Sequence, residues 1–326
     1  MLQINNLIQE NKFQEAVDTC SNLNCNRLAL LLADIYKLTL NKINKTNVKI
    51  MLLCNWCSTE ELTTLWNKMN YPNSGIELVL KDPDFWVIIN AYSGQNYNKK
   101  RSIVFRMEPR MIENPNIWGE WANPKDEDFL RVLRHEKGDF NNCEWHLSKS
   151  CTELLNYNPI KTKIFSTVLS DKYRDVGQVK RIDFLKFLEK KGMDIDVYGN
   201  NKWDYKNFKG TLPYHKKDDA IFPYKYTFNC ENNSIFNYFT EKLLDGILGE
   251  CLTFYWGCPN IPEYINPKAY VKLELSNFEE DYNLILRAIK EDWYSQRLPY
   301  IREAKQKILT EMQFIPRIKQ VLQPHI

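Results

Sequence analysis

The sequence lacks any long apolar run. None of its hydrophobic stretches approaches the roughly 20 residues that a helix needs to cross a bilayer. The first residues, MLQINN, also lack the basic and then apolar pattern of a secretory signal. We therefore expect a soluble, cytoplasmic protein with no transmembrane segment.

The chain also has little excess charge of either sign. Its formal net charge is +3 over 326 residues, which gives no electrostatic reason to expect a nucleic-acid partner. One local pocket can still hold an anionic small molecule. Hydrophobic residues make up 44% and charged residues 26%, as in ordinary globular proteins, and the length suggests two domains.

The nine cysteines show no pairing pattern. They are scattered and odd in number, which is typical of reduced thiols. Cys54 and Cys57 form a lone C-x-x-C without the second ligand pair that a zinc site needs. We expect inert, partly buried thiols. The four histidines are isolated; His146 could touch an acceptor molecule, but a packing role is the simpler interpretation.

Two kinds of hydrophobic pattern divide the chain. Residues 1–44 have the spacing of two amphipathic helices, which predicts a helical hairpin. This hairpin either caps the rest of the protein or serves as an interaction element for a partner or a homo-oligomer.

Beyond residue 44, buried strands alternate with helices. We expect strands over residues 48–54, 75–80, 85–90, 102–107, 164–169, 195–198, 224–230 and 252–256. We expect helices over residues 59–70, 180–191, 238–248, 277–297 and 300–314, with irregular loops over a cleft between 115 and 160. This alternation predicts parallel sheets covered on both faces. The boundaries we expect are a first Rossmann-like domain at 45–160, a second at 161–300 and a C-terminal helix at 301–326.

The most informative stretch follows the predicted strand 224–230. That strand ends at the polar residues Glu231 and Asn232, and a helix is predicted to start near Asn237. A helix N-terminus beside the carboxyl end of a strand binds phosphate readily. Lys242 lies in the first turn, where the helix dipole disfavours a cation, and this placement is reasonable if an anion sits beside it.

Arg181, at the start of the helix predicted for 180–191, is a second candidate for binding phosphate. An arginine grips phosphate with a planar fork, whereas a lysine offers a point charge. The alternative is that Arg181 and Lys242 are solvated charges on helix surfaces, as most such residues are.

The stretch resembles a known signature. YKYTFNCENNS at 224–234, followed by YFTEK at 238–242, is similar to the donor-binding signature of the α-1,3-fucosyltransferases, glycosyltransferase family 10. That signature reads roughly Y-K-F-x-x-x-F-E-N-S, a short spacer, then Y-V-T-E-K. FYWG at 254–257 and NPK at 266–268 also look like the family. The resemblance extends over about 75–300, and the chain is similar to soluble bacterial and large-DNA-virus members. Asn233 and Phe239 depart from the usual Ser and Val.

The resemblance implies both a fold and an activity. The fold is α/β of GT-B type, in which two Rossmann-like domains face a cleft. The activity is inverting transfer of L-fucose from GDP-fucose to a hydroxyl of an acceptor sugar on a glycan or glycoprotein. A different nucleotide sugar remains an alternative, because the residues that grip phosphate do not read the hexose. The second alternative is a catalytically idle protein that binds a glycan or a protein partner.

The resemblance also assigns roles to residues. Tyr198, in an element similar to the family's D-x-Y-G, would lie near the nucleotide base. Tyr238 would present its ring or hydroxyl to the nucleotide, or else pack in the core. Glu241 would accept hydrogen bonds from sugar hydroxyls, while Glu231 and Asn232 would line the sugar pocket. With Arg181 and Lys242, these residues form the predicted donor site.

Glu108 is the predicted catalytic base. It follows the buried strand 102–107, and MEP at 107–109 resembles the family element whose Glu is taken as the base. Partial desolvation there would raise its pKa towards neutrality. The alternatives are that Glu108 pairs with Arg106 or Arg110, or that Glu113 or Glu120 is the base.

No metal is expected to be required. Arg181 and Lys242 would neutralise the leaving nucleoside diphosphate, so that manganese would stimulate at most without being essential. Asp194 and Asp196 imitate the D-x-D metal motif of other glycosyltransferases. Chelation that abolished activity would point to that pair instead.

Overall fold

The computed structural model describes residues 15, 47–94, 96–108, 124–141 and 144–325. The chain divides into two compact units, residues 1–48 and 49–326. The helical hairpin predicted for residues 1–44 lies almost wholly outside the described residues. Within the described part of the chain, no helix combines the length and the apolar character that a membrane span requires.

The first sheet contains five strands in the order β2-β1-β3-β4-β5. Its strands are β1 (Val48–Leu53), β2 (Ile76–Leu78), β3 (Phe85–Ile89), β4 (Ser102–Phe105) and β5 (Arg131–Leu133). The registered pairs of β1, β3, β4 and β5 are all parallel. All four residues of β4 are buried, because helices or loops cover both faces of this central strand.

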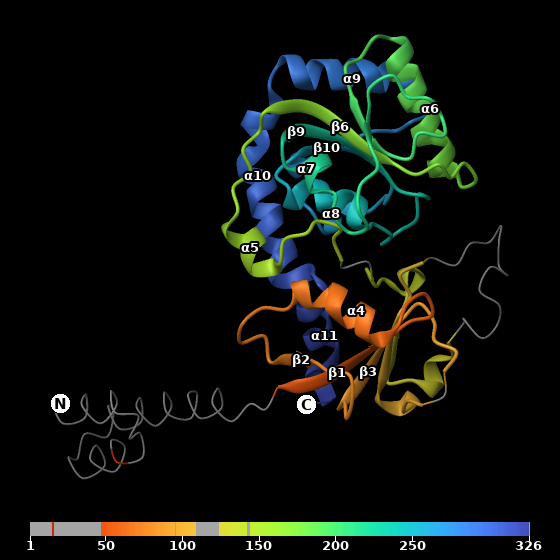
Figure 1. Ribbon diagram of the computed structural model, residues 1–326, viewed down its shortest axis with the longest axis vertical. Helices are drawn as coiled ribbons and strands as arrows, with labels where there is room; N and C mark the ends of the chain where they lie inside the picture. The colour runs from red at the N-terminus through yellow and green to blue at the C-terminus, as the bar shows by residue number, and fades with distance from the viewer. Residues whose placement is uncertain (1–14, 16–46, 95, 109–123, 142–143, 326) are drawn as a thin grey trace. The chain divides into compact units, whose positions relative to one another are not determined.

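Two helices that are far apart in sequence pack on this sheet. Helix α4 (Thr59–Trp66) begins with a capping box between Ser58 and Glu61. Helix α11 (Phe314–Leu322) returns from the end of the chain, and Figure 1 shows it beside β1 and β3. The ring of Phe314 lies 4.4 Å from that of Trp66 and 5.3 Å from that of Phe105. The C-terminal helix therefore completes the core of the first sheet.

The second sheet has six strands in the order β11-β10-β9-β6-β7-β8. They are β6 (Lys163–Leu169), β7 (Asp196–Gly199), β8 (Phe208–Gly210), β9 (Tyr224–Cys230), β10 (Leu252–Trp256) and β11 (Tyr270–Lys272). All pairings are parallel. Numbered within this sheet, the order is 3-2-1-4-5-6, that of the Rossmann fold, and it reverses between β6 and β9. Such sheets bind ligands in the crevice at the carboxyl ends of those two strands.

Helices cover both faces of the second sheet. Phe184 of α6 (Val176–Lys190) packs on Phe228 of β9 with ring centroids 5.4 Å apart. Gly246 of α8 (Glu241–Leu248) lies against the side chain of Thr227, which points to the opposite face of β9. Figure 1 shows α9 (Phe278–Lys290) near α6, and α10 (Trp293–Lys307) beside α8. The predicted α/β class with two parallel, helix-covered sheets is confirmed.

Several element boundaries differ from those predicted. Helix α6 begins at Val176, so Arg181 lies in its second turn rather than at its start. Helix α8 begins at Glu241, because Asn237 has a φ of +64°, outside the helical region, and Thr240 provides the cap. Tyr238 is thus in the preceding loop.

The predicted boundary between the two C-terminal helices is also wrong. Pro299 lies inside α10 instead of separating two helices. The break falls at Asp292, whose φ of +49° is left-handed. A π-helical turn, Ile308–Met312, then joins α10 to α11. Within the segment expected to be irregular, the structure has β5 and the helix α5 (Cys151–Asn156).

Candidate active site

A cavity of about 500 Å³ lies at the carboxyl ends of the strands, lined by residues from both sheets' loops. Asn90 and Glu108 follow β3 and β4, whereas Lys172 and Asn232 follow β6 and β9. The cavity therefore includes the crevice that the strand order of the second sheet predicts. Five of the eight predicted site residues line it: Glu108, Asn232, Tyr238, Glu241 and Lys242.

Glu231 is the buried anchor of this site, and it does not line the sugar pocket as predicted. Its side chain is 0% exposed. Its carboxylate accepts hydrogen bonds from the Thr240 amide at 2.8 Å and the Thr240 hydroxyl at 2.7 Å. The Tyr255 hydroxyl donates a third at 3.3 Å. Burial raises the pKa of Glu231, while the nearby Lys242 opposes that rise. Glu231 thus positions the start of α8.

Lys242 is held between two carboxylates at the first turn of α8. Its Nζ lies 3.2 Å from Glu241 Oε1 and 3.7 Å from Glu231 Oε2. Burial alone would lower the pKa of Lys242, but Glu241 and Glu231 outweigh burial and raise it. The ammonium group is therefore charged at neutral pH. It lies at the cavity wall in the first turn of α8, the helical position that the sequence predicts.

Glu241 is a cavity carboxylate that lies between two lysines. Its Oε1 lies 3.2 Å from the Nζ of Lys242 and 3.5 Å from that of Lys217. Burial would raise the pKa of Glu241, but these two lysines hold it well below its usual value. Lys217 also binds Asp245 at 2.9 Å, which fixes the ammonium group in place. Glu241 is consequently an ionised hydrogen-bond acceptor at the cavity wall.

Arg181 is a buried cation that has no ion-pair partner among the described residues. It is 5% exposed and lies behind Asn232, whose Oδ1 accepts from Nη1 at 3.2 Å. Nη2 donates to the Ser170 hydroxyl at 2.8 Å, and Nε is buried without a hydrogen-bond partner. Burial lowers the pKa of Arg181, although an arginine keeps its charge. Glu231 and Glu241 stabilise this charge from a distance, and a buried guanidinium without a direct ion pair between the ends of β6 and β9 indicates a place for an anion.

Two tyrosines lie differently from the prediction. Tyr238 is only 2% exposed and packs edge-on against His135, so just part of its side chain reaches the cavity. Tyr198 does not line the cavity at all. It is buried with Ala220 and Tyr224, and its hydroxyl lies 2.9 Å from that of Tyr224. The described geometry therefore gives Tyr198 a packing role and no place in the wall of this cavity.

The start of α6 fits closely against the end of β9. The Gly177 amide donates to the Asn232 carbonyl at 2.8 Å. A Cβ atom at Gly177 would lie 1.9 Å from the Glu231 carbonyl oxygen, far inside van der Waals contact. Only glycine allows this approach, which sets the height of Asn232 and Glu231 above the sheet.

Glu108 faces the charged side of the cavity. Its amide donates to Asn90 Oδ1 at 2.8 Å, and Asn90 itself has a left-handed backbone with a φ of +59°. Glu108 is an exposed residue, but the protein around it partly desolvates its carboxylate and so raises its pKa, and Glu241 adds to this. Lys242 and Lys172 oppose the rise. The upward direction agrees with the pKa expected of a general base. Arg110, Glu113 and Glu120 lie outside the described residues.

Sequence reasoning missed part of the cavity wall. Asn90, Glu144, Lys172 and His215 line the cavity, and none of them was among the predicted site residues. His146, predicted mainly to pack, lines it too. The position of Asn90 and Lys172 just after buried strands was the one available signal. Burial with help from His146 lowers the pKa of His215 to about 3, so that ring is neutral at neutral pH.

The D-x-D pair is occupied by contacts within the protein. Asp194 accepts from the Asn207 side chain at 2.6 Å. Asp196 accepts from the Tyr224 hydroxyl at 2.6 Å and pairs with Lys209 at 3.1 Å. Neither aspartate lines the cavity, so the geometry gives this pair no place at the candidate site.

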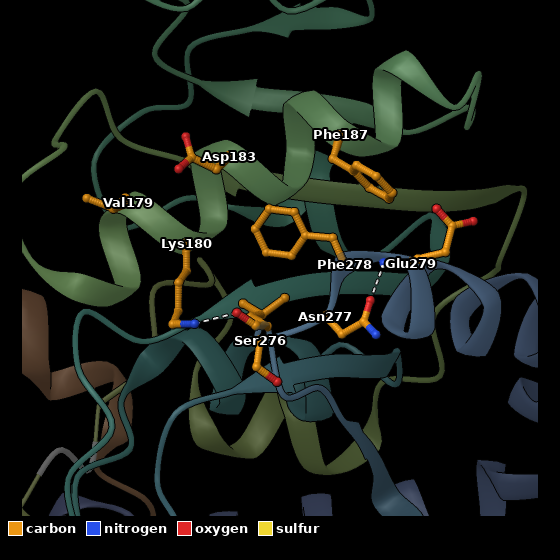
Figure 2. Close-up of a pocket in the computed structure, with 9 residues that line it drawn as sticks. Val179, Lys180, Asp183, Phe187, Ser276, Asn277, Phe278 and Glu279 are labelled. Atoms are coloured by element: carbon orange, nitrogen blue, oxygen red, sulfur yellow. Dashed lines mark hydrogen bonds between the residues drawn. The ribbon is translucent and has the colours of Figure 1, made fainter.

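A second cavity, of about 570 Å³, lies between α6 and the start of α9 (Figure 2). Its charged residues have partners within the protein: Lys180 donates to the Leu275 carbonyl, Asp183 accepts from Tyr173, and Glu279 pairs with Lys191. Figure 2 shows the rings of Phe187 and Phe278 side by side, and their centroids are 5.7 Å apart.

A comparison with protein families connects this geometry to a known domain. Residues 158–294, which include β6 to β11 and all the second sheet's contributions to the cavity, match the family model described as glycosyltransferase family 10 (fucosyltransferase) C-term. This part of the chain is therefore similar to the C-terminal domain of glycosyltransferase family 10. The family resemblance expected from the sequence is thereby confirmed.

Relatives of the family 10 domain differ in how much they share with this chain. The α-(1,3)-fucosyltransferase FucT of Helicobacter pylori is 34% identical over 80 residues, which are 24% of this chain and 17% of that protein. The chain thus matches less than a fifth of that relative's length.

Solved structures are less similar. A crystal structure of an α1,3-fucosyltransferase with GDP aligns with 80% of this chain and 90% of its own at 17% identity and a TM-score of 0.48. The T4 phage BGT complex with UDP-glucose aligns with 84% of this chain and 99% of its own at 12% identity and a TM-score of 0.46. At these scores, the strand order itself is the evidence for the fold.

Proposed function

We propose that the protein is an inverting glycosyltransferase that moves L-fucose from GDP-fucose to a hydroxyl of an acceptor sugar. The name of the family 10 domain and that of the matching H. pylori enzyme support a fucosyl donor. The observation that carries the proposal is the unpaired guanidinium of Arg181 at the switch point, with Lys242 at the nearby start of α8. Two fixed cations at this crevice suit the diphosphate of a nucleotide sugar.

The donor-side residues would act mainly by positioning. Arg181 and Lys242 would neutralise the diphosphate as the bond between the sugar's anomeric carbon and the phosphate oxygen breaks. Glu241, held ionised by two lysines, would accept hydrogen bonds from donor hydroxyls. Asn232 would orient the fork of Arg181, which it already contacts at 3.2 Å.

Glu108 would act on the acceptor side. Its carboxylate would take the proton of the acceptor hydroxyl while that oxygen forms the new bond to the anomeric carbon. The bond to GDP breaks on the opposite face of the sugar in the same displacement, so the anomeric configuration inverts. The proposal places no metal in this step, because Arg181 and Lys242 would supply the positive charge.

The experiment is a donor screen with the full chain. GDP-fucose, GDP-mannose, UDP-glucose and UDP-galactose are offered with a panel of acceptor sugars, and calorimetric titration compares GDP with UDP. We expect GDP to bind more tightly than UDP, and GDP-fucose to be the donor that turns over.

Each alternative has its own outcome. Tighter binding of UDP would contradict the guanine assignment. Turnover of GDP-mannose instead of GDP-fucose would mean that the transferred sugar is mannose. GDP binding without turnover of any donor would favour the catalytically idle binding protein. Unchanged GDP affinity in both Arg181→Met and Lys242→Met would show that these two residues do not bind the diphosphate.

A further inference from the structure

Glu144, His146 and His215 form a separate cluster on the cavity wall. Each offers one ligand atom, and these atoms all lie within 4.8 Å of one another. His146 Nε2 is 3.6 Å from Glu144 Oε1, and the two imidazole rings have centroids 3.8 Å apart. None of the residues predicted for the donor site belongs to this cluster.

The groups converge without satisfying one another. The 3.6 Å between His146 and Glu144 exceeds hydrogen-bond distance. His215 is only 7% exposed, and its Nδ1 is buried without a hydrogen-bond partner. A buried, unpartnered imidazole nitrogen costs free energy and requires an explanation. A ligand that accepts electron pairs from all three side chains would supply it.

We propose that Glu144, His146 and His215 bind a divalent transition-metal ion of the zinc class. Two imidazoles and one carboxylate are a donor set that Zn²⁺ uses, with a further position left for water or substrate. Bonds of about 2.0–2.1 Å in a tetrahedral site place neighbouring ligand atoms about 3.4 Å apart. The separation between His146 and Glu144 is close to that value. Mg²⁺ and Ca²⁺ prefer oxygen ligands and fit this cluster poorly.

The backbone holds both loops in place for such a site. The His146 amide donates to Asp245 Oδ1 at 2.7 Å, and the Lys217 amide donates to the His146 carbonyl at 2.8 Å. The nearby ammonium groups are engaged elsewhere: Lys217 binds Asp245 at 2.9 Å, and Lys68 donates to the Leu147 carbonyl at 2.8 Å. Glu241 Oε1, 4.0 Å from His146, adds negative charge beside the cluster.

Cys54 and Cys57 are the competing zinc ligands within the described part of the chain, since their Sγ atoms lie 3.5 Å apart. The test therefore uses the full chain, freed of metal with a chelator, as wild type and as three variants. These are His215→Ala, Glu144→Gln and the double thiol variant Cys54→Ser/Cys57→Ser. Zn²⁺ is titrated calorimetrically, and Co²⁺ is added as a spectroscopic probe.

We expect one Zn²⁺ per wild-type chain and the same affinity in the thiol variant. Affinity should fall at least about 100-fold in His215→Ala and Glu144→Gln, because even outer-shell partners of a metal are worth about 10- to 100-fold. Bound Co²⁺ should show the visible bands of a tetrahedral nitrogen and oxygen site without thiolate charge transfer.

The proposal fails if the wild type binds no zinc, or if binding is lost only in the thiol variant. It also fails if Glu144→Gln, with an unchanged melting temperature, binds zinc as the wild type does. Glu144→Gln keeps the size of the side chain, so it separates metal binding from folding. The donor screen measures sugar transfer and nucleotide binding, whereas this test measures zinc affinity and cobalt spectra. The proposed function and the proposed metal site can therefore each fail without the other.

Discussion

Replacing Arg181 by methionine should separate binding from stability. In the free protein its guanidinium makes two good hydrogen bonds, to Ser170 at 2.8 Å and Asn232 at 3.2 Å, and Nε has no partner. Hydrogen bonds to a charged group contribute about 1.5–3 kcal/mol each. Burying an ion without a counter-ion costs several kcal/mol. The two contributions nearly cancel, so the free energy of unfolding of Arg181→Met should change by less than about 1 kcal/mol.

The same substitution should weaken nucleotide binding markedly. Losing charge-assisted contacts to a phosphate costs about 1.5–3 kcal/mol, which corresponds to a roughly 10- to 150-fold higher Kd for GDP. Calorimetric titration measures the Kd, and urea denaturation without ligand measures stability. Arg287→Met, on the exposed surface of α9, is the matched control and should change neither quantity.

Unlike Arg181→Met, Lys242→Met should lower the free energy of unfolding. It leaves Glu231 buried without its lysine, and breaking a buried ion pair costs about 3–5 kcal/mol. We expect a loss near 3 kcal/mol, because Thr240 and Tyr255 still donate to Glu231. The reasoning is refuted if Arg181→Met loses more than about 3 kcal/mol of stability while its GDP affinity is unchanged. Arg181 would then be a structural cation.

Three further predictions concern catalysis, packing and metal. Glu108→Gln should fold and bind GDP but turn over about 10²–10⁴ times more slowly; the wild-type rate should fall as pH drops through the raised pKa of Glu108, and the variant should lose this acidic limb. Near-normal turnover in the folded variant would move the base elsewhere. Gly177→Ala should weaken GDP binding at least tenfold by calorimetry, because its Cβ would lie 1.9 Å from the Glu231 carbonyl oxygen and must displace Asn232; wild-type affinity would contradict this account. EDTA should leave the GDP Kd within about twofold, since Arg181 and Lys242 supply the positive charge, and a loss restored by manganese would contradict their role.

Long apolar strands were predictable from the sequence. The structure has β9 at Tyr224–Cys230 and β10 at Leu252–Trp256, with the predicted bounds, because mainly apolar residues bounded by polar ends indicate buried strands. The three-residue strands β5, β8 and β11 carry too few residues for any period to be visible.

Other features depend on tertiary structure. The start of α8 was placed too early because Tyr238 and Phe239 continue its apolar pattern, whereas Asn237 takes a left-handed conformation that no spacing rule reveals. Glu231 and Tyr198 were assigned from a resemblance that does not state burial. His146 and His215 come from loops 69 residues apart, and only folding brings their rings within 3.8 Å.

His135 connects the two walls of the cavity. Its Nε2 lies 3.2 Å from the Met107 carbonyl, next to Glu108, and its Nδ1 lies 3.0 Å from the Asn237 carbonyl, next to Tyr238. The Asn237 side chain returns a hydrogen bond to the His135 carbonyl at 2.7 Å. A single imidazole therefore links the two segments, and the gap between Glu108 and the loop before α8 cannot widen unless these buried contacts break. Burial lowers the pKa of His135, so its ring is neutral and carries one N–H. The ring can therefore donate a hydrogen bond to only one of the two carbonyls at a time. Protonation of the ring would allow it to donate to both carbonyls at once.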